Sequence, residues 1–490
     1  MLLMISFKAH NSDATALAHR IQKGDISPIE AVEECFKRLP DLQKKTNALT
    51  YLDKEGAKNY IHHHLPKKAP FRGVPILLKG LGHAFKGYPS TAGSRLLKDT
   101  HYPQTDFFTQ SLLDAGFVPI GQTNVPEFGL KYISDSVLFG PVKNPMNPAY
   151  YAGGSSGGSA AAVKSGMVAI ASASDGGGSI RIPASFCGLV GLKPTRGRTA
   201  TGPTSFRGWE GAAIHFVLAK SVRDTASALL ALQRQQDASP FQVPLLQEKD
   251  FDQAFDALHT LTIAYSTESP LGEKVSDEAI LAVEKTAEAL SKLGFNVKRA
   301  TPKIDGKTLL KGYYLMNAAE MQAEFQSMEE AFQSPIHVGE VEPISYGLAQ
   351  LGKEIKAFEY PKIFNQWDQA AYAMSLFHKD FDLFLQPTTM SPAPALSDTL
   401  YQEKDLEDLT KWSQTGNREQ LFATLYSLFS TGHLTASWPF IYNLTGQPAL
   451  TLPLHNCANG LPLGVMFSAP KGREDLLLAL AAFLENNDLF

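Results

Sequence analysis

Apolar residues follow two different periods in the first hundred positions of the chain. A spacing of three and four in EAVEECFKRL predicts a helix, and SPIE at 27–30 supplies a capping box with proline at the first helical position. The run GVPILLKGLG has the length and the flanking glycines of a strand that is buried on both faces. Lys79 stands at the end of this predicted strand.

Helical and strand patterns then alternate along the chain. Helix-to-strand pairs are predicted at 106–116 and 117–124, at 156–166 and 167–174, and at 221–233 and 261–267. Such alternation requires crossover connections. We therefore expect an α/β fold with a large mixed, mostly parallel β-sheet covered by helices on both faces.

The pattern becomes looser after about Asp237. Helices are predicted at 276–294, at about 308–333 and at 474–486, with strands at 382–389, 448–454 and 461–469. No linker rich in proline, glycine and serine separates the halves, and no internal repeat is visible. We expect a single domain over 1–490.

Composition narrows the class of protein. Of 490 residues, 44% are hydrophobic and 19% charged, which is typical of a globular chain, and the net charge of −4 offers no basic surface for nucleic acid. Three cysteines at 35, 187 and 457 are too few for a disulfide framework and lack metal-ligand spacing. The start has no basic region or cleavage site, and no uninterrupted apolar run is long enough to span a membrane. These features predict a soluble, cytoplasmic protein.

Two clusters of glycine and serine carry the candidate chemistry: GGSSGGS at 153–159 and DGGGS at 175–179. Neither has the spacing of a phosphate-binding loop. The first matches the G-x-S-x-G nucleophile elbow of esterases at 153–157, but a loop with two prolines precedes it where the elbow needs a strand. No Asp and His follow in a convincing setting.

The two clusters used together favour a different arrangement. After the strand that ends at Asp175, glycines 176–178 can turn successive N–H groups toward one point beside the hydroxyl of Ser179. This predicts a nucleophile inside its own oxyanion hole, formed by Gly176, Gly177, Gly178 and Ser179. No histidine is near either cluster in the sequence, so Lys79, with a pKa lowered by burial, is the candidate base and Ser155 the proton relay.

At this point the chain resembles a known family. GVPILLKG, GGSSGGSAAAV and DGGGSIRIPASFCGLVGLKPTRGR are similar to the amidase signature family, whose members hydrolyse amides with a Ser, cis-Ser, Lys triad. The resemblance makes Ser179 the nucleophile, Ser155 the bridging serine after a cis peptide bond, and Lys79 the base. It implies a signature region at about 70–230 and a more variable, substrate-shaping half at about 237–490.

Two departures from the family pattern stand beside the predicted site. Gly176 replaces a common Thr or Ile, which we expect to open space beside the oxyanion hole, and Gly80 replaces a common Asp. The DGGGS block looks closest to the branch that contains 6-aminohexanoate cyclic-dimer hydrolase. It is less similar to the glutaminase subunit of amidotransferases, which usually reads DTGGS.

Other residues receive supporting or structural roles. Asp175 and Arg181 are expected to hold the turn, while Ser156 and Ser159 are expected to cap and pack the following helix, with Ser156 next to the proton relay. No metal site is expected from the histidines at 62–64. The aromatic residues that could line the pocket are Tyr132, Phe139, Phe206, Trp209 and Trp438, on loops around 125–140 and 203–215 and elsewhere.

The function expected is that of a serine hydrolase cleaving carboxylic amide bonds through an acyl-enzyme. Its substrates would be linear or cyclic small amides, including nylon-type oligomers, with water as the acyl acceptor and no cofactor. A homodimer is expected, without nucleic acid or membrane. Two alternatives stay open: a glutaminase subunit acting in an amidotransferase complex, and an esterase or carbamate hydrolase that uses the same triad.

Overall fold

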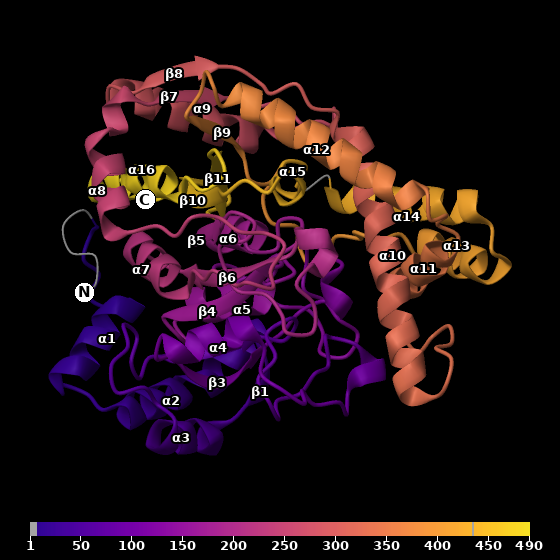
Figure 1. The fold of residues 1–490 in the computed structure, drawn as a ribbon, viewed down its shortest axis with the longest axis horizontal. Helices are drawn as coiled ribbons and strands as arrows, with labels where there is room; N and C mark the ends of the chain where they lie inside the picture. The colour runs from indigo at the N-terminus through magenta and orange to yellow at the C-terminus, as the bar shows by residue number, and fades with distance from the viewer. Residues whose placement is uncertain (1–6, 434–435) are drawn as a thin grey trace.

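The structure, a computed structural model, describes residues 7–433 and 436–490, so the apolar start at 1–6 lies outside the described residues. One 11-stranded sheet has the strand order β1-β3-β2-β4-β6-β5-β10-β11-β9-β7-β8 (Figure 1). The strands are β1 Leu49–Leu52, β2 Pro75–Lys79, β3 Val118–Thr123, β4 Ile170–Asp175, β5 Val190–Lys193, β6 Ile214–Ala219, β7 Thr262–Tyr265, β8 Asn296–Arg299, β9 Leu383–Pro387, β10 Ala449–Asn456 and β11 Pro462–Ser468.

The expected large mixed sheet is confirmed. Parallel pairs occur in two groups, β3-β2-β4 and β9-β7-β8. Between these groups the strands pair antiparallel, from β4 through β6, β5, β10 and β11 to β9, and β1 is antiparallel to β3. Parallel pairing is therefore confined to these two groups, and the strands between them are antiparallel, although only β10 and β11 among them form a hairpin.

All the predicted helices and strands are present in the structure. The helices are α1 Ala14–Lys23, α2 Pro28–Thr46, α3 Lys54–His63, α4 Phe107–Asp114, α5 Gly157–Ser165, α6 Arg181–Cys187, α7 Val222–Leu232, α8 Glu248–Asp256, α9 Asp277–Lys292, α10 Gly306–Phe332, α11 Pro343–Lys353, α12 Glu359–Phe377, α13 Glu403–Thr415, α14 Arg418–His433, α15 Pro439–Thr445 and α16 Glu474–Asn486. The predicted capping box of α2 forms between Ser27 and Glu30. Within the described ranges, no helix combines the length and the apolar character needed to cross a bilayer.

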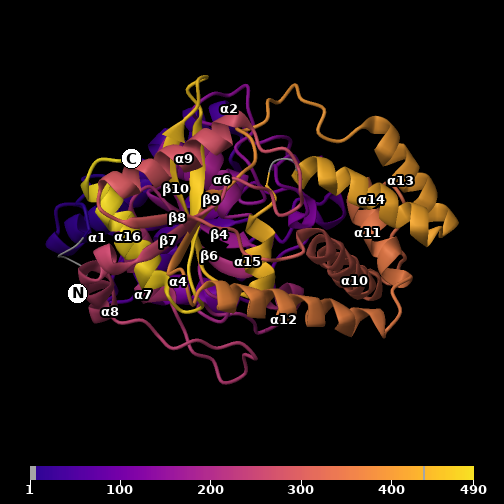
Figure 2. The ribbon, with the colours of Figure 1, turned by 90° about the horizontal axis from the view of Figure 1, so that it is seen from above.

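Helices cover both faces of the sheet. Figure 2 shows α6 and α9 on one side of the strands and α4, α7 and α16 on the other. Helices α10, α11, α13 and α14 pack together beyond one end of the strands, as a separate helical flank. The sheet itself contains strands from both halves of the chain, and the single domain stays a prediction.

The register of β2 and β4 determines where Lys79 meets the DGGGS cluster. These strands are parallel, with Leu77 opposite Ala171, so Lys79 and Asp175 both end at the same edge of the sheet. Every residue of β2 is buried, including Lys79. Residues separated by about a hundred positions therefore converge at one edge.

A buried ion pair attaches the last helix to the sheet. Both carboxylate oxygens of Glu474 accept from Arg198, at 3.0 Å from Nε and 2.8 Å from Nη2, and Oε1 also accepts from the Thr195 N–H. Both side chains of the pair are fully buried. The pair therefore couples the start of α16 to the segment that follows β5.

We expect Glu474→Gln to lower the free energy of unfolding by about 3–5 kcal/mol, because it leaves a buried guanidinium without its counter-charge. Urea denaturation followed by circular dichroism measures this change. The matched control is Glu288→Gln, which breaks a pair with Lys292 whose side chains are 64% and 73% exposed. The control should keep the wild-type midpoint, since exposed pairs contribute little. Equal midpoints for both variants would contradict this role for Glu474.

Candidate active site

Lys79 and Ser155 lie in direct contact at the edge of the sheet. Lys79 Nζ is 2.9 Å from Ser155 Oγ, 2.8 Å from Ser174 Oγ and 3.3 Å from the Ser174 carbonyl oxygen. The lysine is 1% exposed and Ser155 is 2% exposed. Ser174, on β4, was missed by the sequence analysis, although it stands next to the recognised DGGGS block.

Burial lowers the pKa of Lys79 to about 7, and the negative charge of Asp175 opposes this shift only in part. An amine with this pKa is largely uncharged just above neutral pH. The N-terminus of α5, which begins two residues after Ser155, adds positive potential to the same region. The group expected to serve as a base thus has the protonation behaviour that a base requires.

The loop around Ser155 is held by other serines. The Gly154–Ser155 peptide bond is cis. The Ser156 hydroxyl donates to the Ser174 carbonyl oxygen at 3.2 Å, and the Ser156 N–H donates to the Ser179 carbonyl oxygen at 3.3 Å. Ser156 makes no side-chain cap on α5, so the capping role expected for it is wrong: its hydroxyl is turned toward β4 instead. Ser156 therefore joins the loops that carry Ser155 and Ser179.

Asp175 holds the turn before Ser179. Its Oδ1 accepts from the Gly178 N–H at 2.7 Å and its Oδ2 from the Ile180 N–H at 3.1 Å. Arg181 donates to both oxygens, at 2.8 and 2.9 Å. Burial alone would raise the pKa of Asp175, but the adjacent Arg181 guanidinium reverses this and holds the pKa well below its ordinary value.

This arrangement changes the expected oxyanion hole. Because the Gly178 N–H already donates to Asp175 Oδ1, we do not expect it to donate to an oxyanion. The candidate donors are reduced to the N–H groups of Gly176, Gly177 and Ser179. The expected roles of Asp175 and Arg181 in holding this turn agree with their hydrogen bonds.

Asn443, from α15, is a further member of this network that the sequence analysis did not single out. Its Nδ2 donates to the Asp175 carbonyl oxygen at 2.7 Å and to the Ala212 carbonyl oxygen at 2.9 Å, while its Oδ1 accepts from Arg181 at 2.7 Å. The signal was available, since Asn443 begins NLTGQPALTLP, one of the segments that match the family pattern. The turn before Ser179 is thus fixed from the second half of the chain.

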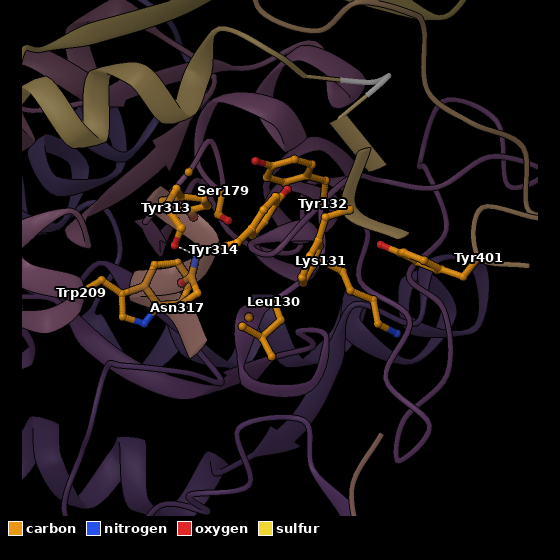
Figure 3. A pocket seen from close by; sticks show the side chains of 12 residues that line it. Leu130, Lys131, Tyr132, Ser179, Trp209, Tyr313, Tyr314, Asn317 and Tyr401 are labelled. Carbon is orange, nitrogen blue, oxygen red and sulfur yellow. Dashed lines mark hydrogen bonds between the residues drawn. The ribbon is translucent and has the colours of Figure 1, made fainter. Parts of the chain in front are cut away.

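Ser179 opens onto a pocket with aromatic walls (Figure 3). The space left free in it is about 30 Å³, which suits water-sized molecules and is too small for a substrate without side-chain movement. Of the aromatic residues predicted, Tyr132 and Trp209 line it, whereas Phe139, Phe206 and Trp438 lie outside its walls. The lining residues are Gly129, Leu130, Lys131, Tyr132, Gly177, Ser179, Trp209, Tyr313, Tyr314, Asn317, Tyr401 and Phe429.

The side of the pocket formed by Lys131 carries no free cation. Lys131 is 3.0 Å from Asp135 and 2.6 Å from Glu342, and it is 8% exposed. Although burial opposes the shift, these two carboxylates raise the pKa of Lys131 above its ordinary value. In Figure 3 its side chain points away from Ser179 toward Tyr401. The ammonium is therefore neutralised by the protein itself.

Two histidines, His83 and His215, lie close to Lys79, but their hydrogen bonds go to other residues. His83 Nδ1 is 2.6 Å from Ser172 Oγ, and His83 Nε2 is 3.1 Å from His215 Nδ1. Burial lowers the pKa of His215 to about 4 and that of His83 well below its ordinary value. Their hydrogen bonds run to Ser172 and to each other. The nucleophile-elbow esterase would need a histidine bonded to Ser155, and these hydrogen bonds of His83 and His215 do not provide it.

One group of potential metal ligands occurs within the described part of the chain. The ligand atoms of Glu278, His455 and Cys457 lie within 4.8 Å of one another, away from the pocket of Ser179. Glu278 is already satisfied by His455 Nε2 at 2.7 Å and by the Ala458 N–H at 3.0 Å. These bonds attach the β10–β11 hairpin to α9, which accounts for the cluster structurally.

Comparison with known proteins finds a family match over most of the chain and similar proteins that are named as enzymes. The family model named Amidase matches residues 30–478. A lipoamidase of Enterococcus faecalis is 36% identical over 483 residues, covering 98% of this chain, which spans 64% of that longer protein. The 6-aminohexanoate-cyclic-dimer hydrolase of Paenarthrobacter ureafaciens is 31% identical, with 96% of this chain and 94% of that protein covered.

Solved structures agree with the sequence comparisons. The structure of 6-aminohexanoate cyclic dimer hydrolase with its substrate superimposes with a TM-score of 0.85 and 29% sequence identity, covering 97% of this chain and 96% of that chain. A bacterial aryl acylamidase superimposes with a TM-score of 0.83 at 23% identity, which concerns the fold alone.

Gly80 is the departure next to Lys79, and the structure gives its reason. A Cβ at this position would lie 2.6 Å from the Thr123 carbonyl oxygen, so neither alanine nor the aspartate common in the family fits without a shift of β2 or β3. We expect Gly80→Ala to lower the free energy of unfolding by about 1–3 kcal/mol and to reduce activity by displacing Lys79. Urea denaturation and initial rates measure the two effects.

Gly208→Ala is the control for this substitution, because a Cβ there meets nothing closer than 3.7 Å. It should unfold at the wild-type midpoint. A Gly80→Ala protein with wild-type stability and wild-type rates would show that the crowding at Thr123 relaxes without consequence.

Proposed function

This chain belongs to the amidase signature family, and on that premise we propose that it cleaves carboxylic amides with Ser179 as nucleophile, Ser155 as proton relay and Lys79 as base. That it is an amidase follows from the family and from relatives named as amidases and amide hydrolases. The observation that carries the residue roles is the buried contact of 2.9 Å between Lys79 Nζ and Ser155 Oγ, at an amine whose pKa is about 7.

The proposed reaction has two steps that each return the site to its starting protonation. Uncharged Lys79 takes the hydroxyl proton of Ser155 while Ser155 takes that of Ser179, and Ser179 Oγ bonds to the amide carbon. The Lys79 proton then returns through Ser155 to the leaving amine as the C–N bond breaks. Water attacks the acyl-enzyme by the same route and releases the carboxylic acid with Ser179 restored.

The oxyanion is proposed to bind to the N–H groups of Gly176, Gly177 and Ser179. Each well-aimed donor is worth about 2.7–4 kcal/mol in the transition state. The hydrogen bonds that the N–H groups of Gly178 and Ile180 donate to the Asp175 carboxylate keep this turn in one conformation. The charge that develops in the reaction then meets donors that are already in position.

We infer a substrate with an uncharged, apolar acyl group. The walls next to Ser179 are Tyr132, Trp209, Tyr313 and Tyr314, and the ammonium of Lys131 is neutralised. Lipoyl amides and the cyclic dimer of 6-aminohexanoate, which has no free amine, are the first substrates to assay, because relatives are named for them. Hydrolysis by the purified chain would disfavour a glutaminase subunit that is active only in a complex. A higher rate on matched esters or carbamates would favour the second alternative, an esterase or carbamate hydrolase that uses the same triad.

We also propose that the enzyme acts in the cytoplasm as a homodimer. All three cysteines are free and buried, as expected in a reducing compartment. Fractionation of cells and light scattering of the purified protein test these two points.

Replacing the nucleophile should abolish turnover. We expect Ser179→Ala to lower kcat by more than about 10⁴-fold on any amide that the wild type hydrolyses, since the acyl-enzyme cannot form. Ser165→Ala, at the end of α5, is the control and should retain full activity. Initial rates and electrospray mass spectrometry of the trapped acyl-enzyme measure the loss. Full activity of the Ser179→Ala protein would remove this residue as the nucleophile.

The rate should follow the titration of Lys79. Because only the uncharged amine accepts a proton, kcat/KM is expected to rise with pH and to level off above an apparent pKa of about 7. Below that value it should fall about tenfold per pH unit. Initial rates between pH 5 and 9 measure this pH dependence, and circular dichroism at each pH checks that the protein stays folded. A flat profile between pH 5 and 8 would contradict Lys79 as the base.

A further inference from the structure

The loop that carries Trp209 has an unusual backbone. In the short turn Gly208–Gly211, Trp209 has φ 49° and Glu210 has φ 51°, so two consecutive residues with side chains adopt the left-handed conformation. This conformation is strained for residues with side chains, and such residues persist where the surroundings hold them, commonly at functional sites. A tryptophan kept in this conformation beside Ser179 calls for an explanation.

The surroundings of the ring supply part of the explanation. The Trp209 ring lies edge-on to Tyr313, with centroids 6.1 Å apart, and the Tyr313 hydroxyl donates to the Gly176 carbonyl oxygen at 3.1 Å. The Ala212 N–H donates to the Trp209 carbonyl oxygen at 2.9 Å. Figure 3 shows Trp209 and Tyr313 on the same side of the pocket. The ring is therefore fixed against the turn that precedes Ser179.

Gly176 and Trp209 occupy complementary space. A Cβ on Gly176 would lie 2.7 Å from each of two carbons of the Trp209 six-membered ring. The space that this glycine was expected to open beside the oxyanion hole is thus filled, and that expectation is wrong: the indole stands where a threonine or isoleucine side chain would begin. The glycine at 176 is required by the tryptophan at 209.

We propose that Trp209, seated on Gly176, is the end wall of the acyl pocket and sets the longest acyl chain that the enzyme accepts. The proposal rests on the function proposed above. It concerns the acyl group because the ring adjoins Gly176, next to the carbonyl that bonds to Ser179, and because the acyl group must stay in this pocket after the amine has left. The substrate class is therefore amides of short, uncharged acids.

The first experiment compares acyl chain lengths. The probes are p-nitroanilides of acetic, butyric, hexanoic, octanoic, decanoic and dodecanoic acids, and kcat/KM is measured for wild type, Trp209→Gly and Trp209→Phe. Glycine adopts the left-handed backbone without strain, so the loop keeps its course while the ring is removed. For the wild type we expect kcat/KM to decline beyond a certain acyl length. In Trp209→Gly, the ratio of kcat/KM for the two longest chains to that for butyrate should rise at least tenfold.

Trp209→Phe is the matched control, because it keeps a ring on the same backbone. It should give an intermediate length profile. A length profile that is the same in all three proteins overturns the proposal, as does a shift that appears only when the amine is lengthened with the acyl group held at butyrate. Failure of the wild type to hydrolyse any amide would instead overturn the proposed function.

The second experiment tests the complementarity of the two positions. Gly176→Ala should lower kcat/KM for the butyryl anilide at least tenfold in the wild-type background, since its Cβ meets the indole. In the Trp209→Gly background the same substitution should lower kcat/KM for the butyryl anilide less than threefold. Thermal unfolding of all four proteins shows whether they fold. Equal losses in both backgrounds overturn the proposal, because the two positions would then act independently.

Discussion

An uncharged amine in a dry site is the condition on which the active site depends. Lys79 ends a strand that is buried along its whole length, and its Nζ finds two serine hydroxyls and a carbonyl oxygen in place of water. Desolvation penalises the ammonium, and the pKa falls to about 7. An exposed lysine with the same neighbours would stay charged at neutral pH, and the contact with Ser155 would then be a donor bond without basic character.

The nearby charges are arranged so that Lys79 can stay uncharged. Asp175 is ionised and close enough for its charge to act on Lys79. An unpaired carboxylate there would raise the pKa of Lys79 and favour the ammonium form. Arg181 binds both of its oxygens, so most of its negative charge is compensated locally. Asn443 then bonds to both members of the pair. One buried ion pair thus shapes the turn before Ser179 and limits its own effect on Lys79.

The sequence predicted the parts of the site that depend on local pattern. The glycine-serine clusters, the strand before Lys79 and the helices with clear periodicity are all where the pattern placed them. It could not predict contacts set by the sheet register, such as Ser174 on Lys79 or the His83–His215 pair, because residues 83 and 215 come together only when β2, β4 and β6 align. Trp209 was a candidate by type, but its seat on Gly176 depends on a backbone conformation that composition does not reveal.

The two tasks of the site are divided between different parts of the fold. The groups proposed to react, Lys79, Ser155 and Ser179, lie at the end of β2, just before α5 and just after β4, and all three are buried. The pocket walls come from α10, from the 129–132 and 209 loops and from Phe429 in the helical flank, which are joined to the sheet by fewer elements. Substitutions in the flank can therefore reshape the pocket while the distance from Lys79 to Ser155 is kept.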